Sequence, residues 1–197
     1  MRIPFDEAER ILRSSPNHRI LRRIPAVGDW SFPTVTNPDV RRGAFVDVET
    51  TGLDIETDEV IELAILPFEY DTKSGAILKI CTDDGLFAYR EPTIVIPPEV
   101  QAVHGISAED VKGATIAPET LAAILKSVQI IIAHNAAFDR PMAEKHWPIF
   151  EHKAWACSLT EIDWRGESMS AGKLDYLLAR ESLNKSEDSR LLRSSPW

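Results

Sequence analysis

Apolar residues in the first half of the chain come in short runs separated by turn residues. Four segments have the pattern of extended strands, the fourth more weakly than the others: 44–49, 59–69, 76–81 and 87–96. A polar turn at 71–75, Asp-Thr-Lys-Ser-Gly, separates the second strand from the third. Three closely spaced strands with short connections predict an antiparallel meander.

From residue 97 onward, helical and extended patterns alternate. The helical segments are 99–104, a start at 107–110, 118–126, 136–146 and 171–181, and the extended ones are 129–133 and 155–158. The start at 107–110, Ser-Ala-Glu-Asp, has the form of a capping box. Together with the meander, this order predicts an α/β fold, a mixed sheet with an antiparallel three-strand part and parallel strands, flanked by helices.

The N-terminal 42 residues have a different pattern. Residues 5–13 predict a helix with Phe5, Ala8, Ile11 and Leu12 on one face, and a short basic segment follows at 19–23. The stretch after it is irregular and rich in proline. Since this segment is too short to bury a core alone, we interpret residues 1–42 as a basic, Pro-rich appendage that lies against the main domain.

Composition limits the class of protein. The chain has 197 residues, 44% of them hydrophobic, with a net charge of −9, which is typical of a globular domain and argues against a protein that coats nucleic acid. No apolar run reaches the length of a membrane span, and the N-terminus lacks the apolar core of a signal peptide. Cys81 and Cys157 have no metal-ligand spacing, so we expect reduced thiols in a cytoplasmic protein without a membrane partner.

Candidate chemistry first appears at residues 45–54, Phe-Val-Asp-Val-Glu-Thr-Thr-Gly-Leu-Asp. Asp47 and Glu49 lie two positions apart on a strand, so their carboxylates share one face, about 6–7 Å apart. Magnesium or manganese would offset their repulsion. Gly52 is expected to turn the chain with a positive φ. The alternative is a strand end with two solvated acids.

A second stretch repeats this arrangement. Residues 130–139, Ile-Ile-Ile-Ala-His-Asn-Ala-Ala-Phe-Asp, predict a buried strand, a polar turn and an acid in the first turn of a helix. Two central strands of one sheet could bring Asp139 within reach of Asp47. Asp139 could instead simply complement the helix N-terminus, and His134 could be a capping or core residue.

The two stretches resemble the first two motifs of the DEDD superfamily of 3'-5' exonucleases, and look closest to the epsilon, or proofreading, subunits of bacterial DNA polymerase III and their stand-alone relatives. The sequence Val-His-Gly-Ile-Ser at 103–107 is similar to the family's His-Gly-Ile turn. The resemblance implies a ribonuclease H-like fold in an exonuclease domain at 43–182, followed by an atypical polar tail at 183–197, with the C-terminal end of the fold truncated.

The resemblance also implies roles for individual residues. Asp47, Glu49 and Asp139 would be the catalytic carboxylates and would hold two divalent cations, Mg or Mn. The bound partner would be the 3' end of single-stranded DNA or RNA, and association with a DNA polymerase stays open. The residues implied to border that end are Thr50, Thr51, Leu53, His104, Asn135 and Phe138.

This chain departs from the pattern of the family's last motif. The family places a His and, five residues later, an Asp in a window that here holds Asp188 and Arg193, and no His follows His152. We therefore expect a metal-dependent 3'-5' exonuclease whose turnover is impaired. The alternatives are a catalytically weak nucleic-acid-binding or regulatory module with the same fold, and a generic α/β domain with acids at strand ends.

Overall fold

A computed structural model of the chain describes residues 3–14, 30–166 and 174. The expected N-terminal helix is confirmed as α1 (Phe5–Ser14). The predicted basic segment at 19–23 and the tail at 183–197 lie outside the described residues. Of the helix predicted at 171–181, only residue 174 lies within them, and it is helical.

The described residues form a six-stranded mixed sheet with the order β3-β2-β1-β5-β6, in which β4 also pairs with β2. The strands are β1 (Val40–Thr50), β2 (Val60–Asp71), β3 (Ile77–Ile80), β4 (Leu86–Tyr89), β5 (Val128–Ala133) and β6 (Ala154–Cys157). Strands β1, β2 and β3 are antiparallel neighbours, which confirms the meander, and β5 and β6 add to β1 in parallel. Strand β1 is therefore central and has neighbours on both sides.

The helices follow the predicted order. They are α2 (Pro98–His104), α3 (Ala108–Val111), α4 (Pro118–Leu125) and α5 (Ala136–His146), with short 3₁₀ segments η2 (Thr82–Asp84) and η3 (Pro148–His152) that the sequence pattern did not predict. The capping box at Ser107 is confirmed, because its side chain and that of Asp110 each bond the other's backbone N–H. Proline occupies the first turn of α2 and of α4, where its missing N–H has no partner to lose.

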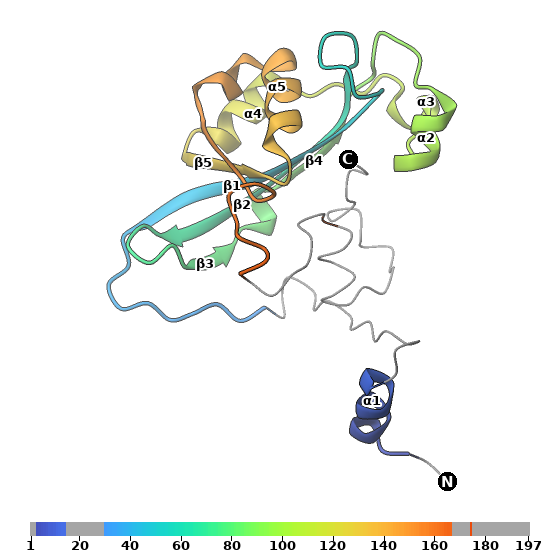
Figure 1. Cartoon of the computed structure of the whole chain (residues 1–197). Coiled ribbons are helices and arrows are strands. Elements are labelled where there is room, and N and C mark those ends of the chain that lie inside the picture. The colour runs from blue at the N-terminus through green and yellow to red at the C-terminus, as the bar shows by residue number, and fades with distance from the viewer. Residues whose placement is uncertain (1–2, 15–29, 167–173, 175–197) are drawn as a thin grey trace.

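Alternation along β1 determines which face is the core. Ala44, Val46 and Val48 are buried together with residues of β2, α4 and α5, and Figure 1 shows α4 and α5 side by side on one face of the sheet. A smaller buried cluster, with Ile61 and Ile106 among its members, joins β2 to the α2–α3 region. The odd-numbered positions of β1, which include both predicted acids, point away from the main core.

The observed bounds differ from the predicted ones mainly at strand ends. Strand β1 begins at Val40, inside the predicted appendage 1–42, and β4 is shorter than the weak extended piece predicted at 87–96. Both cysteines, Cys81 and Cys157, are buried free thiols. Within the residues that the structure describes, no helix has the length and apolar character needed to cross a membrane.

Candidate active site

The centre of the candidate site is the C-terminal half of β1. Asp47 lies opposite Ala64 of β2, and Glu49 lies opposite Glu62. In an antiparallel pair, opposed residues share a face, so Glu62 adds a third carboxylate beside Glu49. Glu49 and Glu62 are only 5% and 7% exposed. The sheet thus holds acidic side chains in a buried environment, and the alternative of two solvated acids is excluded for Glu49.

Helix α5 brings a fourth carboxylate to the same place. The chain leaves β5 through Asn135, whose φ of 128° turns it into α5. Asp139 lies in the first turn of this helix and is 4% exposed. The backbone N–H groups of Val48 and of Asp139 itself donate hydrogen bonds to its carboxylate. Because Val48 separates the two acids of β1, this contact fixes Asp139 beside them.

The electrostatics show that these acids interact. Burial raises the pKa of Asp47 well above its ordinary value, and the charges of Asp139, Glu49 and Glu62 raise it further. Burial also raises the pKa of Asp139 to about 7, although its two backbone hydrogen bonds act in the opposite direction. In the protein without cations, Asp47 and Asp139 therefore keep their protons to a higher pH than the same acids do in water.

The donor chemistry of this cluster fits hard divalent cations, which prefer several carboxylate oxygens. A cation among the four acids would remove the repulsion that raises the pKa of Asp47. Across the described part of the chain, however, no three His, Cys, Asp or Glu side chains already converge as ligands of one ion. The residue types and their proximity thus suit cations, whereas a finished coordination sphere is not preformed.

A pocket of about 180 Å³ opens beside the cluster. It is lined by Glu49, Glu62, Phe87, Tyr89, His104, Gly105, Ile106 and Asp110. Two carboxylates of the cluster thus form one wall, and two aromatic rings of β4, with centroids 6.0 Å apart, form another. This combination can accept hydrogen bonds and pack against a flat ring in one small space.

The His-Gly-Ile turn shapes the pocket from the α2 side. Gly105 ends α2 with φ of 76°, a left-handed conformation that favours glycine. His104 is buried, and its Nδ1 accepts the N–H of Ile106 at 2.9 Å. That bond requires Nδ1 to be unprotonated, so the ring presents Nε2–H as its donor. The structure therefore brings the predicted residue His104 together with Glu49 in one pocket.

The polar turn after β1 is built differently from our expectation. Gly52 does not adopt a positive φ. A Cβ at Gly52 would lie 2.4 Å from the carboxylate of Asp58, so glycine serves the close approach of Asp58 instead. Thr51 is fully buried, and its hydroxyl donates to Asp58 and accepts the N–H of Glu59. Thr50 is buried as well, and its hydroxyl donates to the carbonyl of Gly52 at 2.6 Å.

The remaining predicted site residues flank the carboxylates in the sequence. Leu53 is 47% exposed in the turn after β1. Phe138 is partly buried and packs against the main core, one residue before Asp139. Asn135 caps α5 through its carbonyl, not its side chain. His134 lies away from the pocket lining, with Nδ1 2.9 Å from the hydroxyl of Ser158.

Sequence reasoning missed several residues of this region. Glu62, Phe87, Tyr89 and Asp110 line the pocket, yet none was a predicted site residue. A signal existed for Glu62, since an acid flanked by apolar residues in a strand, Val-Ile-Glu-Leu at 60–63, is costly to bury without a purpose. The aromatic pair carries no such signal, because the pairing of β4 with β2 brings it into the site. Asp110 belongs to α3, where the sequence indicates only its capping role.

Comparisons with known proteins agree with this geometry. The exonuclease family model RNase_T matches residues 44–149. Ribonuclease T of Shewanella baltica (strain OS155 / ATCC BAA-1091) is 32% identical over 121 residues, which cover 53% of this chain and 52% of the relative. The chain therefore spans about half the length of the curated relatives that it matches.

Solved structures of low sequence identity share the fold. Exonuclease I in complex with inhibitor BCBP has a TM-score of 0.55 and 14% identity, and the match covers 78% of this chain and 39% of that one. The zinc-ion-bound complex of E. coli exonuclease I with single-stranded DNA has a TM-score of 0.50 and 16% identity, and the match covers 76% and 37%. These likenesses confirm the ribonuclease H-like mixed sheet flanked by helices that was expected.

The family match extends over more than half of the chain and contains Asp47, Glu49 and Asp139. It confirms the expected membership of the DEDD exonuclease superfamily, whereas the closer resemblance to epsilon subunits stays an expectation. The chain belongs to the RNase_T exonuclease family.

Proposed function

We propose that this protein is a metal-dependent 3'-5' exonuclease that removes nucleoside monophosphates from the 3' end of a single-stranded nucleic acid. The observation that carries the proposal is the cluster of acids around Asp47, in which burial and then the charges of neighbouring carboxylates raise the pKa of Asp47. Burying several like charges is costly unless something positive joins them. In a chain of the exonuclease family, divalent cations are the natural partner.

Asp47, Glu49 and Asp139 would hold the cations, and Mg or Mn fits their oxygen donors. Two such cations, when bound, supply activation of the attacking water and stabilisation of the leaving oxygen. The protein's own residues supply position. Hydrogen bonds from the Val48 and Asp139 N–H groups hold the Asp139 carboxylate in place, and the buried strand β1 fixes the other two acids.

The nucleic-acid end would lie across the carboxylates, bordered by residues of the first and second motifs. Leu53 is exposed in the turn four residues after Glu49, Phe138 precedes Asp139, and His104 lines the neighbouring pocket. The names of the relatives point to both kinds of polymer, RNA for ribonuclease T and single-stranded DNA for exonuclease I. We therefore propose a single-stranded 3' end of DNA or RNA as the substrate, in the cytoplasm. Association with a polymerase stays a prediction.

A second candidate function is nucleic-acid binding with little turnover. The sequence after residue 152 contains no His to serve as the family's general base. Such a base contributes roughly 10²–10⁴-fold to rate. We therefore propose slow hydrolysis in this chain, although its sequence contains the three motif acids Asp47, Glu49 and Asp139.

The direction in which the strand is degraded and the dependence of degradation on metal ions together test the proposal. The protein is incubated with manganese and a single strand labelled either at the 5' or at the 3' end. A 3'-5' exonuclease releases the 3' label at once as a mononucleotide, while the 5' label passes through a ladder of shortening strands. Asp47→Asn and chelation by EDTA should both abolish release. Release from the 5' end first, or release that persists in Asp47→Asn, would refute the proposal.

A further inference from the structure

A lysine outside the carboxylate cluster holds the loop that follows the first motif. This loop, residues 51–59, connects β1 to β2 and carries the exposed Leu53. The Nζ atom of Lys145, in the last turn of α5, donates hydrogen bonds to three carbonyls of the loop. The acceptors are Ile55 at 2.9 Å, Glu56 at 2.8 Å and Asp58 at 2.9 Å. An ammonium has three donors, so all of its hydrogen-bonding capacity goes to this one loop.

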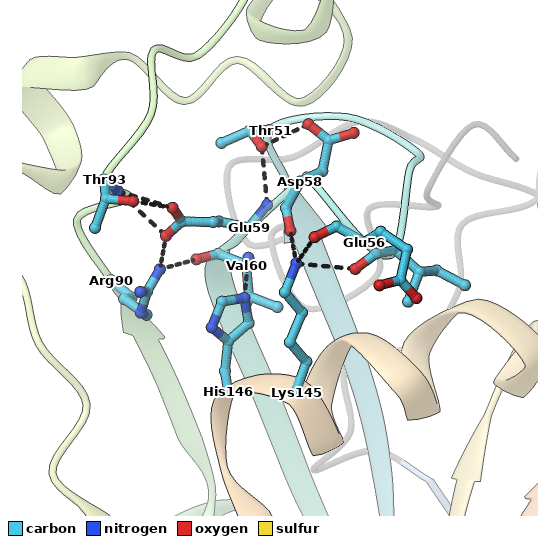
Figure 2. Close-up of polar contacts among 10 residues, drawn as sticks. Thr51, Glu56, Asp58, Glu59, Val60, Arg90, Thr93, Lys145 and His146 are labelled. Carbon is cyan, nitrogen blue, oxygen red and sulfur yellow. Dashed lines mark hydrogen bonds and ion pairs between the residues drawn. The ribbon is translucent and has the colours of Figure 1, made fainter.

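The other contacts of the loop close it on itself or hold its ends, whereas Lys145 ties its middle to α5. Within the loop, Asp54 accepts the N–H groups of Glu56, Thr57 and Asp58. The carboxylate of Asp58 accepts from Thr51 Oγ1 at 2.9 Å and from the N–H of Asp54 at 2.8 Å. Glu59, where the loop joins β2, accepts from Arg90 at 2.7 Å and from Thr93, as Figure 2 shows. The carbonyls of 55 and 56 are bonded to Lys145.

The next residue along α5 strengthens the same connection. His146 Nε2 accepts the N–H of Val60 at 3.0 Å, and Figure 2 shows the two side chains rising from α5 next to each other. The last turn of α5 therefore holds the loop and the start of β2. The first turn of the same helix carries Asp139, about 9 Å away along the axis at the usual rise per residue. One rigid helix thus fixes both a carboxylate of the cluster and the loop beside it.

We propose that Lys145 is a positioning residue for the nucleic-acid end. It acts by fixing the loop that carries the exposed Leu53, four residues after Glu49. The inference rests on the proposed function. Loss of Lys145 removes the hydrogen bonds that tie the middle of the loop to α5, without touching Asp47, Glu49 or Asp139. Binding of the strand should weaken, whereas the rate of hydrolysis of bound strand should change little.

The chain offers a matched control. Lys153 Nζ also donates to backbone carbonyls, those of Leu125 and Val128, at the connection from α4 to β5. Lys145→Met and Lys153→Met each remove an ammonium and keep an unbranched apolar stem. Both variants lose carbonyl contacts and are expected to lower the melting temperature. Only Lys145→Met should affect the 51–59 loop, and Lys145→Arg, which restores donors to it, should recover part of the loss.

Two measurements test the proposal. Amide hydrogen exchange without nucleic acid should become faster at residues 52–58 in Lys145→Met and stay unchanged there in Lys153→Met. Binding of a fluorescent octathymidylate with calcium as the cation should weaken about tenfold in Lys145→Met, as misplacement of a positioning group predicts. With manganese, KM should rise by a similar factor while kcat stays within about twofold.

The outcomes separate the two proposals. If wild-type protein neither binds nor hydrolyses the strand, the proposed function falls, and this inference falls with it. If the wild type is active, and Lys145→Met has the same KM and the same rate of amide hydrogen exchange at residues 52–58, only the role of Lys145 is overturned. Equal weakening in Lys153→Met would also overturn it, because a general loss of stability would then explain the effect.

Discussion

The buried carboxylate of Asp139 lowers the stability of the metal-free protein, whereas the same carboxylate would help to bind a cation. In the folded protein its pKa is about 7, against an ordinary value of 3.8, because burial disfavours the charged form. A carboxyl with a raised pKa stabilises the fold at pH below 3.8, and this contribution is lost as the pH rises towards 7. At neutral pH the metal-free protein therefore bears the cost of a buried charge that a cation would offset.

The first prediction follows from this opposition. Asp139→Asn removes the charge and should raise the melting temperature of the metal-free protein at pH 8, with a smaller gain at pH 5. Manganese, which should stabilise the wild type by binding the folded state, should have no such effect on the variant. Thermal unfolding with and without manganese measures both. Asp83→Asn, at an exposed position of η2, is the control; a variant less stable than wild type at pH 8 would contradict the account.

A second prediction concerns Phe138. Its ring is partly buried against the core and lies next to Asp139, so it could contact a base or serve as plain core. Phe138→Leu keeps an apolar side chain for the core and removes the flat ring. If the ring stacks on the terminal base, binding of a short single strand should weaken by ~1–3 kcal/mol. Titration of a labelled strand checks this, and unchanged affinity with a lower melting temperature would assign Phe138 to the core alone.

At the scale of elements, α5 joins the two motifs of the site to the loop between β1 and β2. Most elements could be predicted from the sequence, since alternating and helical patterns depend on local burial. The contacts of α5 could not. Lys145 and His146 reach partners 86 to 90 residues earlier in the chain, and nothing local in the sequence signals such pairs. Gly52 shows the same limit. A side chain at this position would clash with the carboxylate of Asp58, and the two residues come this close only in the folded chain.

His146 gives a third prediction, on pH dependence. Burial and the charge of Arg90 lower its pKa to about 4, although Glu59 acts in the opposite direction. The unfolded chain takes up a proton near pH 6.5, so the stability that neutral His146 contributes is present above that pH and is lost as the pH falls towards 4.

Glutamine can accept the N–H of Val60 without titrating, so His146→Gln isolates this effect. The free energy of unfolding of wild type minus variant should decrease on the order of 1–2 kcal/mol between pH 7.5 and 4.5. Denaturant unfolding at several pH values measures the difference, in which the opposite contribution of the buried acids cancels. A difference that does not vary with pH would show that His146 is not held neutral.

On the scale of the whole molecule, the central strand β1 and the start of α5 meet where the partly buried Asp47 lies among three buried acids, Glu49, Glu62 and Asp139. That Asp47, Glu49 and Asp139 meet could be predicted, because two lie on an apolar strand and the third follows one, in a pattern that resembles a known family; their role as metal ligands stays a proposal. For Glu62 the sequence signals only burial. Its place opposite Glu49 and the aromatic wall of the pocket could not be predicted, since both depend on strand register. The domain limits at 42 and 182 stay predictions.

The most direct test of the account is calorimetric titration of the protein with manganese at pH 8, without nucleic acid. Wild type should bind the ion, and Asp47→Ala should lose most of the binding, because hard cations need several oxygen ligands. Asp83→Ala, at the exposed η2 position, should bind like the wild type. Equal affinity in wild type and Asp47→Ala would contradict the claim that the buried carboxylates form a divalent-metal site.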